Sequence, residues 1–379
     1  MVLCGIDNLQ SVDSILRGRR IGLMTNPTGV DHRLRSSIDI LNERYTLTAL
    51  FSCEHGVRGD VQAGLHIASA PDPETGVMVY SVYGSSHHLS EEMLDAFDVF
   101  VYDIQDVGAR FYTYIYSLSY AMEDCARAGK PVIVLDRPNP LGGSRVEGTL
   151  LDERVSSFVG KYAMPTRYGL TVGEYALWVR DYLGLNLELH VAPMLGYSRS
   201  MRYEDTGLPF VPPSPNCATL HAANVYIGTC IFEGTNLSEG RGTVLPFEYI
   251  GAPFVDAPAL ERRMNALNLP GVLFRRAYFT PQFNKHAGVQ CAGVQVHLTD
   301  PHTSSPFAVG LHLLDAIRDM HGDQLEWRGI EDAAYKTIDK LLGTDDYRLG
   351  RMDAGALIRA HQDRILKWQA DSRRYQLYK

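Results

Sequence analysis

A glutamate and a histidine stand side by side directly after an apolar run near the N-terminus. The run at 46–51 is followed by Glu54-His55-Gly56. A carboxyl group can serve as a general acid when burial or a neighbouring charge raises its pKa, and the end of a strand offers such a place. Glu54 is therefore our candidate acid and His55 a candidate substrate contact. The alternative is a solvated loop or a helix cap.

A denser polar group follows the apolar run at 99–102. Asp103 and Asp106 are candidate catalytic carboxylates, and Gln105, Arg110 and Tyr112 are candidate substrate contacts. Carboxylates and amides bind sugar hydroxyls, and aromatic rings provide a flat apolar surface for the sugar. The alternative is that an aspartate pairs with Arg110 to hold the loop while the tyrosines belong to the core.

A third polar group follows the run at 132–135. Asp136, Arg137 and Asn139 alternate with prolines that restrict the loop, and Arg167 lies in a later glycine-containing loop. An arginine can bind a carboxylate through two parallel hydrogen bonds. These four residues are candidate substrate contacts, although Asp136 could equally anchor its own loop.

The loop 233–243 is too polar to belong to a core. Its candidate substrate contacts are Glu233, Asn236, Glu239 and Arg241. The loop lacks the G-x-x-x-x-G-K-[ST] pattern of a phosphate loop. We expect it to close over a cleft in the preceding part of the chain, the alternative being an ordinary surface loop.

Several other chemistries lack their sequence signatures. The chain has no H-E-x-x-H, no G-x-S-x-G and no G-x-G-x-x-G after a strand, which disfavours a metalloprotease, an α/β-hydrolase and a dinucleotide enzyme. Its six cysteines include no C-x-x-C pair and are expected to be reduced thiols. We expect neither a metal nor a cofactor.

Charge and hydropathy narrow the partners. The net charge of −8 repels phosphate backbones, so we expect no nucleic-acid partner. No apolar run approaches the roughly 18 residues of a membrane helix, and the N-terminus lacks the pattern of a signal peptide. We therefore expect no membrane association and a cytoplasmic chain, or a periplasmic or secreted one if a signal peptide has been removed. The oligomeric state is not predicted.

The polar groups must be positioned by the elements between them. Short apolar runs alternate with amphipathic stretches through the first 200 residues, which predicts an α/β domain with a mostly parallel sheet. In such a sheet ligands bind beyond the carboxyl ends of the strands, so Glu54, Asp103 and Asp136 should line one cleft. The expected strands are 21–24, 46–51, 77–80, 99–102, 132–135 and 187–191, and the expected helices are 33–45, 112–128 and 171–184.

The order of elements changes after a proline-rich segment at 205–220. Strand-like runs at 225–232, 271–279 and 289–298 precede helical patterns at 306–320, 330–342 and 353–370. This succession predicts a smaller α+β domain. We therefore place an α/β domain at 1–215 and an α+β domain at 216–379.

Long motifs in a fixed order resemble one known family. They are Glu54-His55-Gly56 with Arg58-Gly59, the stretch from Tyr102 to Tyr114, Asp136-Arg137-Pro138-Asn139-Pro140, Pro213-Ser214-Pro215-Asn216, and the stretch from Glu233 to Thr243. Together they resemble the exo-β-N-acetylmuramidase family of NamZ type, once known only as a domain of unknown function. The resemblance runs from about Gly5 to the C-terminus.

The resemblance implies a Rossmann-like domain that carries the active site and a smaller domain that helps to close it. It implies release of N-acetylmuramic acid from the non-reducing end of peptidoglycan fragments, so the partner is a small muramic-acid-containing sugar or muropeptide. It also implies that Glu54 is the catalytic glutamate, preceded here by Cys53 instead of proline. Alternative functions are a non-catalytic sugar-binding protein and an amidase or deacetylase acting on the same fragments.

The second catalytic group stays open at this point. It could be Asp103, Asp106, Glu233, Glu239 or the substrate's own acetamido group. The lactyl carboxylate of muramic acid calls for a cation. We expect Arg110 first and then Arg137, because both follow strand ends, ahead of Arg167 and Arg241.

Overall fold

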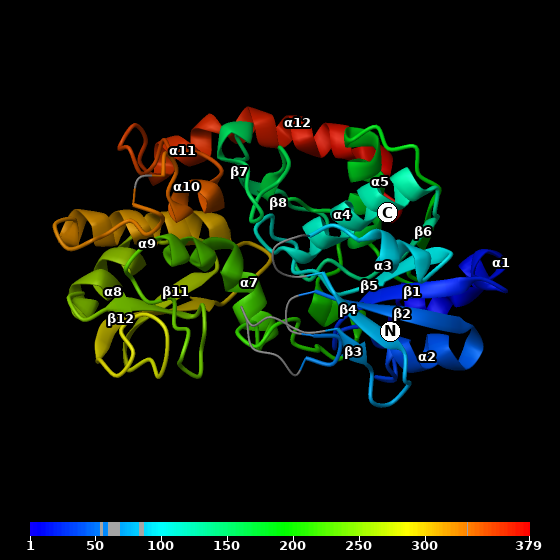
Figure 1. The fold of residues 1–379 in the computed structure, drawn as a ribbon. Coiled ribbons are helices and arrows are strands. Elements are labelled where there is room, and N and C mark those ends of the chain that lie inside the picture. The colour runs from blue at the N-terminus through cyan, green and yellow to red at the C-terminus, as the bar shows by residue number, and fades with distance from the viewer. Residues whose placement is uncertain (54–55, 60–68, 83–86, 332) are drawn as a thin grey trace.

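The first part of the chain is built on a seven-stranded sheet (Figure 1). The computed structural model describes residues 1–53, 56–59, 69–82, 87–331 and 333–379. The sheet order is β3-β4-β2-β1-β5-β6-β9, and every neighbouring pair is parallel except β3 and β4. The strands are β1 (Arg20–Thr25), β2 (Thr46–Ser52), β3 (Ala70–Pro71), β4 (Met78–Ser81), β5 (Val99–Asp103), β6 (Val132–Leu135) and β9 (Leu189–Ala192).

The six parallel strands follow the doubly wound order. Numbered along the chain without β3, they lie as 3-2-1-4-5-6, the arrangement of a Rossmann-like sheet. All six coincide with the predicted strands. Parallel strands are buried on both faces and therefore read as continuous apolar runs, and every residue of β5 and β6 is buried.

Helices cover both faces of this sheet. One face packs against η1 (Gly5–Val12), α1 (Asp13–Leu16) and α2 (Ser37–Arg44), and the other against α3 (Glu91–Asp95), α4 (Tyr114–Ala128) and α5 (Val172–Tyr182). Val99 and Val101 of β5 belong to the hydrophobic core on the face covered by η1, α1 and α2. Phe100 and Tyr102 belong to the core on the face covered by α3, α4 and α5. This is the alternation that a strand imposes on its side chains.

Short elements complete the first part, three of them between β6 and α5 and one after β9. They are the two-stranded sheet β7 (Glu147–Leu150) and β8 (Pro165–Arg167), η2 (Glu153–Val155) and α6 (Tyr203–Thr206). Residues 207–219 then form no helix or strand. The domain boundary that we predict at 215/216 falls inside this segment and stays a prediction.

The second part is α+β, as predicted. A three-stranded antiparallel sheet has the order β10-β12-β11 and packs against α8. The elements are α7 (Leu220–Thr229), η3 (Cys230–Gly234), β10 (Tyr249–Ala252), α8 (Ala257–Ala266), β11 (Val272–Phe279), β12 (Cys291–Leu298), α9 (Pro306–His321), α10 (Thr337–Leu342), α11 (Ala354–Ala360), α12 (Gln362–Ser372) and η4 (Arg373–Tyr375).

Two predicted elements of the second part were wrong. The run at 225–232, read as a strand, is the end of helix α7 followed by η3. Nearly every residue there is buried, and a short apolar run buried on all sides has no periodicity that separates helix from strand. The helix expected at 330–342 is shorter and begins at Thr337.

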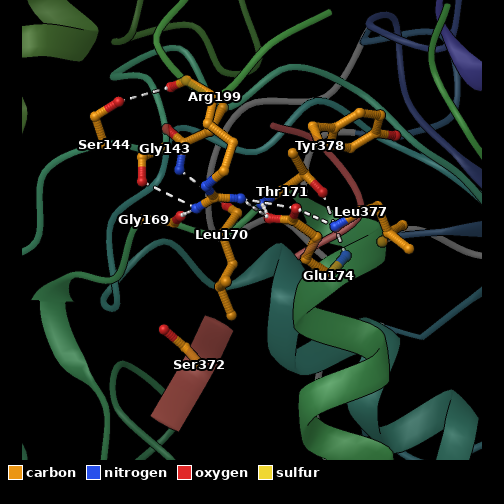
Figure 2. Close-up of polar contacts among 12 residues, drawn as sticks. Gly143, Ser144, Gly169, Leu170, Thr171, Glu174, Arg199, Ser372, Leu377 and Tyr378 are labelled. Atoms are coloured by element: carbon orange, nitrogen blue, oxygen red, sulfur yellow. Dashed lines mark hydrogen bonds and ion pairs between the residues drawn. The ribbon is translucent and has the colours of Figure 1, made fainter. Parts of the chain in front are cut away.

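The last residues of the chain return to the first part and are fixed there by buried carboxylates. α12 lies beside α5 (Figure 1). The ring centroids of Trp368 on α12 and Trp178 on α5 are 5.0 Å apart. Figure 2 shows Glu174 held by Arg199, with the backbone nitrogen of Leu377 donating to the Glu174 carboxylate at 2.8 Å. The C-terminal tail is thus part of the first domain's core.

Within the described ranges, none of the helices is both long enough and apolar enough to span a membrane.

Candidate active site

A cavity of about 260 Å³ lies beyond the carboxyl end of β5, between α4 and the second part of the chain. We call it the central cavity. The first part contributes residues 111–114 and 158–159, the proline-rich connection contributes 214, 216 and 217, and the second part contributes Tyr226, Glu233, Arg241 and Phe247. The cavity is therefore built from segments far apart in the sequence. Tyr112, Glu233 and Arg241 are the predicted site residues that line it.

Aromatic rings form the apolar walls of the central cavity. Tyr112 packs edge-on against Tyr114 at 5.1 Å and against Tyr226 at 5.8 Å, measured between ring centroids. Tyr226 in turn packs edge-on against Phe247 at 4.7 Å. The Tyr114 hydroxyl donates to the Pro213 carbonyl at 2.9 Å, which ties the proline-rich connection to α4. Rigid aromatic walls with few polar groups suit a small polar ring such as a sugar.

The polar floor of the cavity is a cluster of two carboxylates and two cations. Arg241 donates to Glu233 Oε1 through Nε at 3.0 Å and Nη2 at 2.6 Å, and its Nε lies 3.4 Å from Glu239. Lys285 donates to Glu239 at 2.7 Å behind them. Glu233 keeps 30% of its side chain exposed, whereas Glu239 keeps 2%. Burial raises the pKa of Glu233 although Arg241 opposes the rise.

Asp103 and Arg137 do not line the cavity, contrary to our expectation, because they neutralise each other inside the protein. Arg137 donates to both carboxylate oxygens of Asp103, at 2.6 and 2.8 Å, and the two side chains are 5% and 0% exposed. Burial lowers the pKa of Arg137, but Asp103 outweighs it and the pKa is raised. Both carboxylate oxygens of Asp103 are thus engaged by Arg137 and are not offered to a ligand.

Asp136 also points into the core. Its carboxylate accepts hydrogen bonds from the Tyr378 hydroxyl at 2.6 Å, the Thr171 hydroxyl at 2.8 Å and the Gly173 nitrogen at 2.8 Å. Burial raises the pKa of Asp136 to about 7, and the bond from Tyr378 lowers it in part. The anchoring alternative is thus the observed one for Asp136. Neither Asp103 nor Asp136 lines the central cavity, and the shared cleft with Glu54 stays a prediction because Glu54 lies outside the described residues.

The side-chain amides of Gln105 and Asn139, which follow the ends of β5 and β6, donate hydrogen bonds to backbone carbonyls. The Gln105 amide donates to the carbonyls of Asp106 and Pro138. The Asn139 amide donates to the Leu170 carbonyl at 2.9 Å. Both side chains are buried and hold neighbouring loops together.

Arg110 and Arg167 are buried as well, and neither lines the central cavity. Which arginine binds the lactyl carboxylate stays a prediction. Arg110 donates to the carbonyls of Thr149, Met164 and Leu341, the last of which belongs to α10. Burial lowers its pKa to about 10. Arg167 pairs with Glu147 at 3.0 Å.

Asp106 is buried, and none of the described residues pairs a cation with it. It accepts hydrogen bonds from the Tyr168 hydroxyl and from the Gly108 nitrogen, and burial raises its pKa to about 6. Asn236, on the outer loop, exchanges hydrogen bonds with the backbone of Gln324 and Glu326. Neither residue lines the central cavity.

Two family models together match nearly the whole chain. The model described as exo-beta-N-acetylmuramidase NamZ, N-terminal, matches residues 21–221, and its C-terminal counterpart matches residues 224–378. The chain belongs to the NamZ family. A NamZ relative from Bacillus subtilis (strain 168), a peptidoglycan beta-N-acetylmuramidase, is 44% identical over 384 residues, which cover 100% of this chain and 91% of the relative.

Solved structures agree with this NamZ assignment. A DUF1343 family protein from Bacteroides fragilis NCTC 9343 superposes with a TM-score of 0.89 at 36% identity, covering 100% of this chain and 99% of that one. A second DUF1343 protein from the same organism gives a TM-score of 0.77 at 30% identity with the same coverage. The resemblance read from the motifs is thereby confirmed.

The NamZ motif residues Glu54 and His55 lie outside the described residues. The chain that leads to them is described: β2 ends at Ser52, and Cys53 follows with its side chain buried. Burial raises the pKa of the Tyr102 hydroxyl, and Cys53, Asp106 and Tyr114 add to the rise. Cys53 therefore lies near the residues at the end of β5 and the start of α4.

Several cavity residues were not on our list of site residues. Ser214 and Asn216 lie in the Pro213-Ser214-Pro215-Asn216 motif, which we had used only for the family resemblance. Tyr226 and Phe247 are ordinary core residues by type, and no signal in one sequence distinguishes an aromatic wall from a core.

Among the described residues, Asp7, Asp31 and His32 bring three possible metal ligands within 4.8 Å of one another. Asp7 already contacts the His32 ring at 2.6 Å, and Asp31 accepts from the backbone nitrogens of Arg33 and Arg35. None of the three lines the central cavity of this NamZ-family chain.

Proposed function

We propose that this chain is an exo-acting glycoside hydrolase that releases N-acetylmuramic acid from the non-reducing end of peptidoglycan fragments. The observation that carries the proposal is the 44% identity, across the full chain, to a peptidoglycan beta-N-acetylmuramidase. The substrate is accordingly a small molecule derived from peptidoglycan. The cytoplasmic location expected from the N-terminus stays a prediction.

The central cavity supports exo action. Its volume of about 260 Å³ lies just below the range of roughly 300–1,000 Å³ typical of ligand pockets. This is room for one sugar residue and not for several. An enzyme that removes terminal sugars one at a time needs a closed site of this kind, whereas an enzyme that cuts within a strand needs an open groove.

We assign the general acid to Glu54. In the sequence the residue comes two positions after Ser52, where β2 ends. In α/β proteins ligands bind beyond the carboxyl ends of the parallel strands. Protonation of the glycosidic oxygen by a carboxylic acid lets the leaving sugar depart as an alcohol, while positive charge develops on the muramic ring.

Glu233 is the best placed second carboxylate. It lines the central cavity and is partly exposed, whereas Asp103, Asp106 and Glu239 are buried. Arg241 holds Glu233 through one oxygen, and among the described residues the other oxygen has no hydrogen bond, so it can face the substrate or a water molecule. Glu233 can thus stabilise the developing positive charge or activate water. The alternative in which the substrate's acetamido group attacks would leave Glu233 to orient that group.

A single assay tests the proposal. A 4-nitrophenyl N-acetyl-β-muraminide should release nitrophenol, and peptidoglycan fragments should release free N-acetylmuramic acid, identified by mass spectrometry. If the glycoside stays intact while it binds, the chain is a sugar-binding protein. If peptide or acetate is released instead of sugar, the chain is an amidase or a deacetylase.

A further inference from the structure

A second cavity adjoins the central one. It has a volume of about 440 Å³ and is lined by Glu233, Arg328, Ile330, Tyr335, Thr337 and Lys340. We call it the cationic cavity. Glu233 lines both cavities, so a ligand in the central cavity lies next to the cationic cavity. Val159 of the central cavity precedes Gly160, whose α-carbon faces the Lys340 backbone.

Both cations of the second cavity are held by elements that also position Glu233. The Arg328 nitrogen donates to the Gly234 carbonyl at 2.8 Å, and its carbonyl accepts from the Thr337 nitrogen at 3.0 Å. Lys340 lies on α10, and α10 packs so closely on η3 that a side chain at Gly234 would clash with Ile338. Arg328, Lys340 and Glu233 therefore keep fixed relative positions.

The two cavities differ in charge. In the central cavity Arg241 is already paired with Glu233 and Glu239, and Lys285 completes a cluster of two carboxylates and two cations. In the described part of the chain, Arg328 and Lys340 form no ion pair, and the one carboxylate among the described lining residues is Glu233. A carboxylate in either cavity would lie near Glu233, but in the central cavity the cation Arg241 is already paired with that glutamate. In the cationic cavity the two cations Arg328 and Lys340 form no ion pair with any described residue, so their charge can act on an entering carboxylate.

We infer that the cationic cavity binds the carboxylate carried by the substituent on O3 of the terminal muramic acid. The inference rests on the proposed function and assigns substrate discrimination to Arg328 and Lys340, neither of which we had selected from the sequence. Arg241 then serves to hold Glu233. The carboxylate has two sources: the lactyl group itself in an unsubstituted sugar, or the stem peptide where the lactyl group is amide-linked.

Three chromogenic glycosides test this assignment. The first is the 4-nitrophenyl β-muraminide with a free lactyl carboxylate, the second has that carboxylate converted to a carboxamide, and the third carries L-alanyl-D-isoglutamine on the lactyl group. The enzymes are wild type, Arg328→Gln, Lys340→Gln and the double variant. Arg262→Gln is the control, because Arg262 is an exposed cation on α8 that lines neither cavity.

We expect the double variant to lose about tenfold or more in kcat/KM on the muraminide with the free lactyl carboxylate. This loss corresponds to the lower part of the energy range for charge-assisted hydrogen bonds, because the cavity is open to water. The carboxamide should change by less than about twofold, and added salt should weaken the wild-type preference. Arg262→Gln should alter neither value. Melting temperatures of the variants separate a local loss from unfolding.

The outcomes distinguish the two sources of the carboxylate, and they separate a failure of this inference from a failure of the proposed function. A loss confined to the dipeptide glycoside supports the cavity as a carboxylate site and makes the peptide the source. An equal loss on all three glycosides, or no loss on any, overturns the inference while leaving the hydrolase intact. If the wild type cleaves none of the three glycosides, the proposed function fails, and this inference fails with it.

Discussion

The buried ion pair of Asp103 and Arg137 allows a decisive test between a structural and a catalytic role. Replacing Asp103 by Asn or Arg137 by Met leaves the partner charge enclosed without compensation. Breaking a buried pair in this way costs about 3–5 kcal/mol in the free energy of unfolding. Unfolding has an entropy of about 2.1 cal/mol/K per residue. Over roughly 200–380 cooperative residues, that cost corresponds to a fall of about 4–12 °C in Tm.

A matched control lies at the other end of the same strand. Asp98 precedes β5 and pairs with Arg20 at 2.8 Å, but these side chains are 41% and 48% exposed. Because solvent screens exposed pairs, Asp98→Asn should cost about 0–1 kcal/mol. Replacing both buried partners, as Asp103→Leu with Arg137→Met, should be less damaging than either single change, since no charge is then left alone.

Calorimetry gives Tm, and hydrolysis of the chromogenic muraminide well below Tm gives kcat. We expect Asp103→Asn to lower Tm by the stated amount while the folded enzyme keeps kcat within about tenfold of wild type. General acid–base groups contribute about 10²–10⁴-fold to kcat. A variant with unchanged Tm and kcat reduced by about a hundredfold or more would refute the structural assignment and return Asp103 to the catalytic site.

Three further predictions concern the acid, its partner and the C-terminal tail. Glu54→Gln should lower kcat by about 10²–10⁴-fold without changing Tm, and retention of more than about a tenth of wild-type kcat would exclude Glu54 as the acid. Arg241→Met removes the charge that opposes the raised pKa of Glu233, so the acidic limb of the pH profile of kcat/KM should move to higher pH; an unmoved limb would argue against an ionised Glu233 in catalysis. Tyr378→Phe should destabilise the fold by about 1–2 kcal/mol, measured by denaturant unfolding. The pKa of Asp136 in the folded protein is raised to about 7, so its protonated form contributes stability that is lost as pH rises through about 4 to 7. Losing the hydrogen bond from Tyr378 raises that pKa further. The destabilisation by Tyr378→Phe should therefore be larger at pH 8 than at pH 5.

The sheet was predictable because its strands carry a simple physical signal. β5 and β6 are buried on both faces, so their sequences are unbroken apolar runs between polar turns. Helix α7 was not predictable by the same means. Its side chains are buried in the same hydrophobic core as Phe100 and Tyr102. Its sequence therefore lacks the polar stripe that reveals a helix at a surface.

The site was predictable in place but not residue by residue. Polar residues do gather at the carboxyl edge of the sheet, and the 233–243 loop does supply Glu233 and Arg241 to the cavity. The sequence cannot tell whether Asp103 faces a ligand or Arg137, because both outcomes need the same residue types at the same strand ends. Only the fold decides which charges neutralise each other.

The arrangement at the strand ends explains why the cavity needs the second part of the chain. In a doubly wound sheet the ligand crevice lies between β1 and β5, where the strand order reverses. Here that place is closed by hydrogen bonds: Thr25 donates to the Asp103 carbonyl at 2.8 Å, the Gln105 nitrogen to the Thr28 hydroxyl at 2.8 Å, and Arg137 to the Val30 carbonyl at 2.9 Å.

Among the described residues, the central cavity lies farther out, at the start of α4. Glu233, Tyr226 and Phe247 supply the missing walls. Arg110 reaches from the first part to the Leu341 carbonyl, and Trp368 donates to the Tyr168 carbonyl, so the two parts are fastened through buried contacts. If Glu54 and Glu233 act together as we propose, they belong to different parts of the chain, and a change that loosens these contacts should lower kcat before it unfolds either sheet.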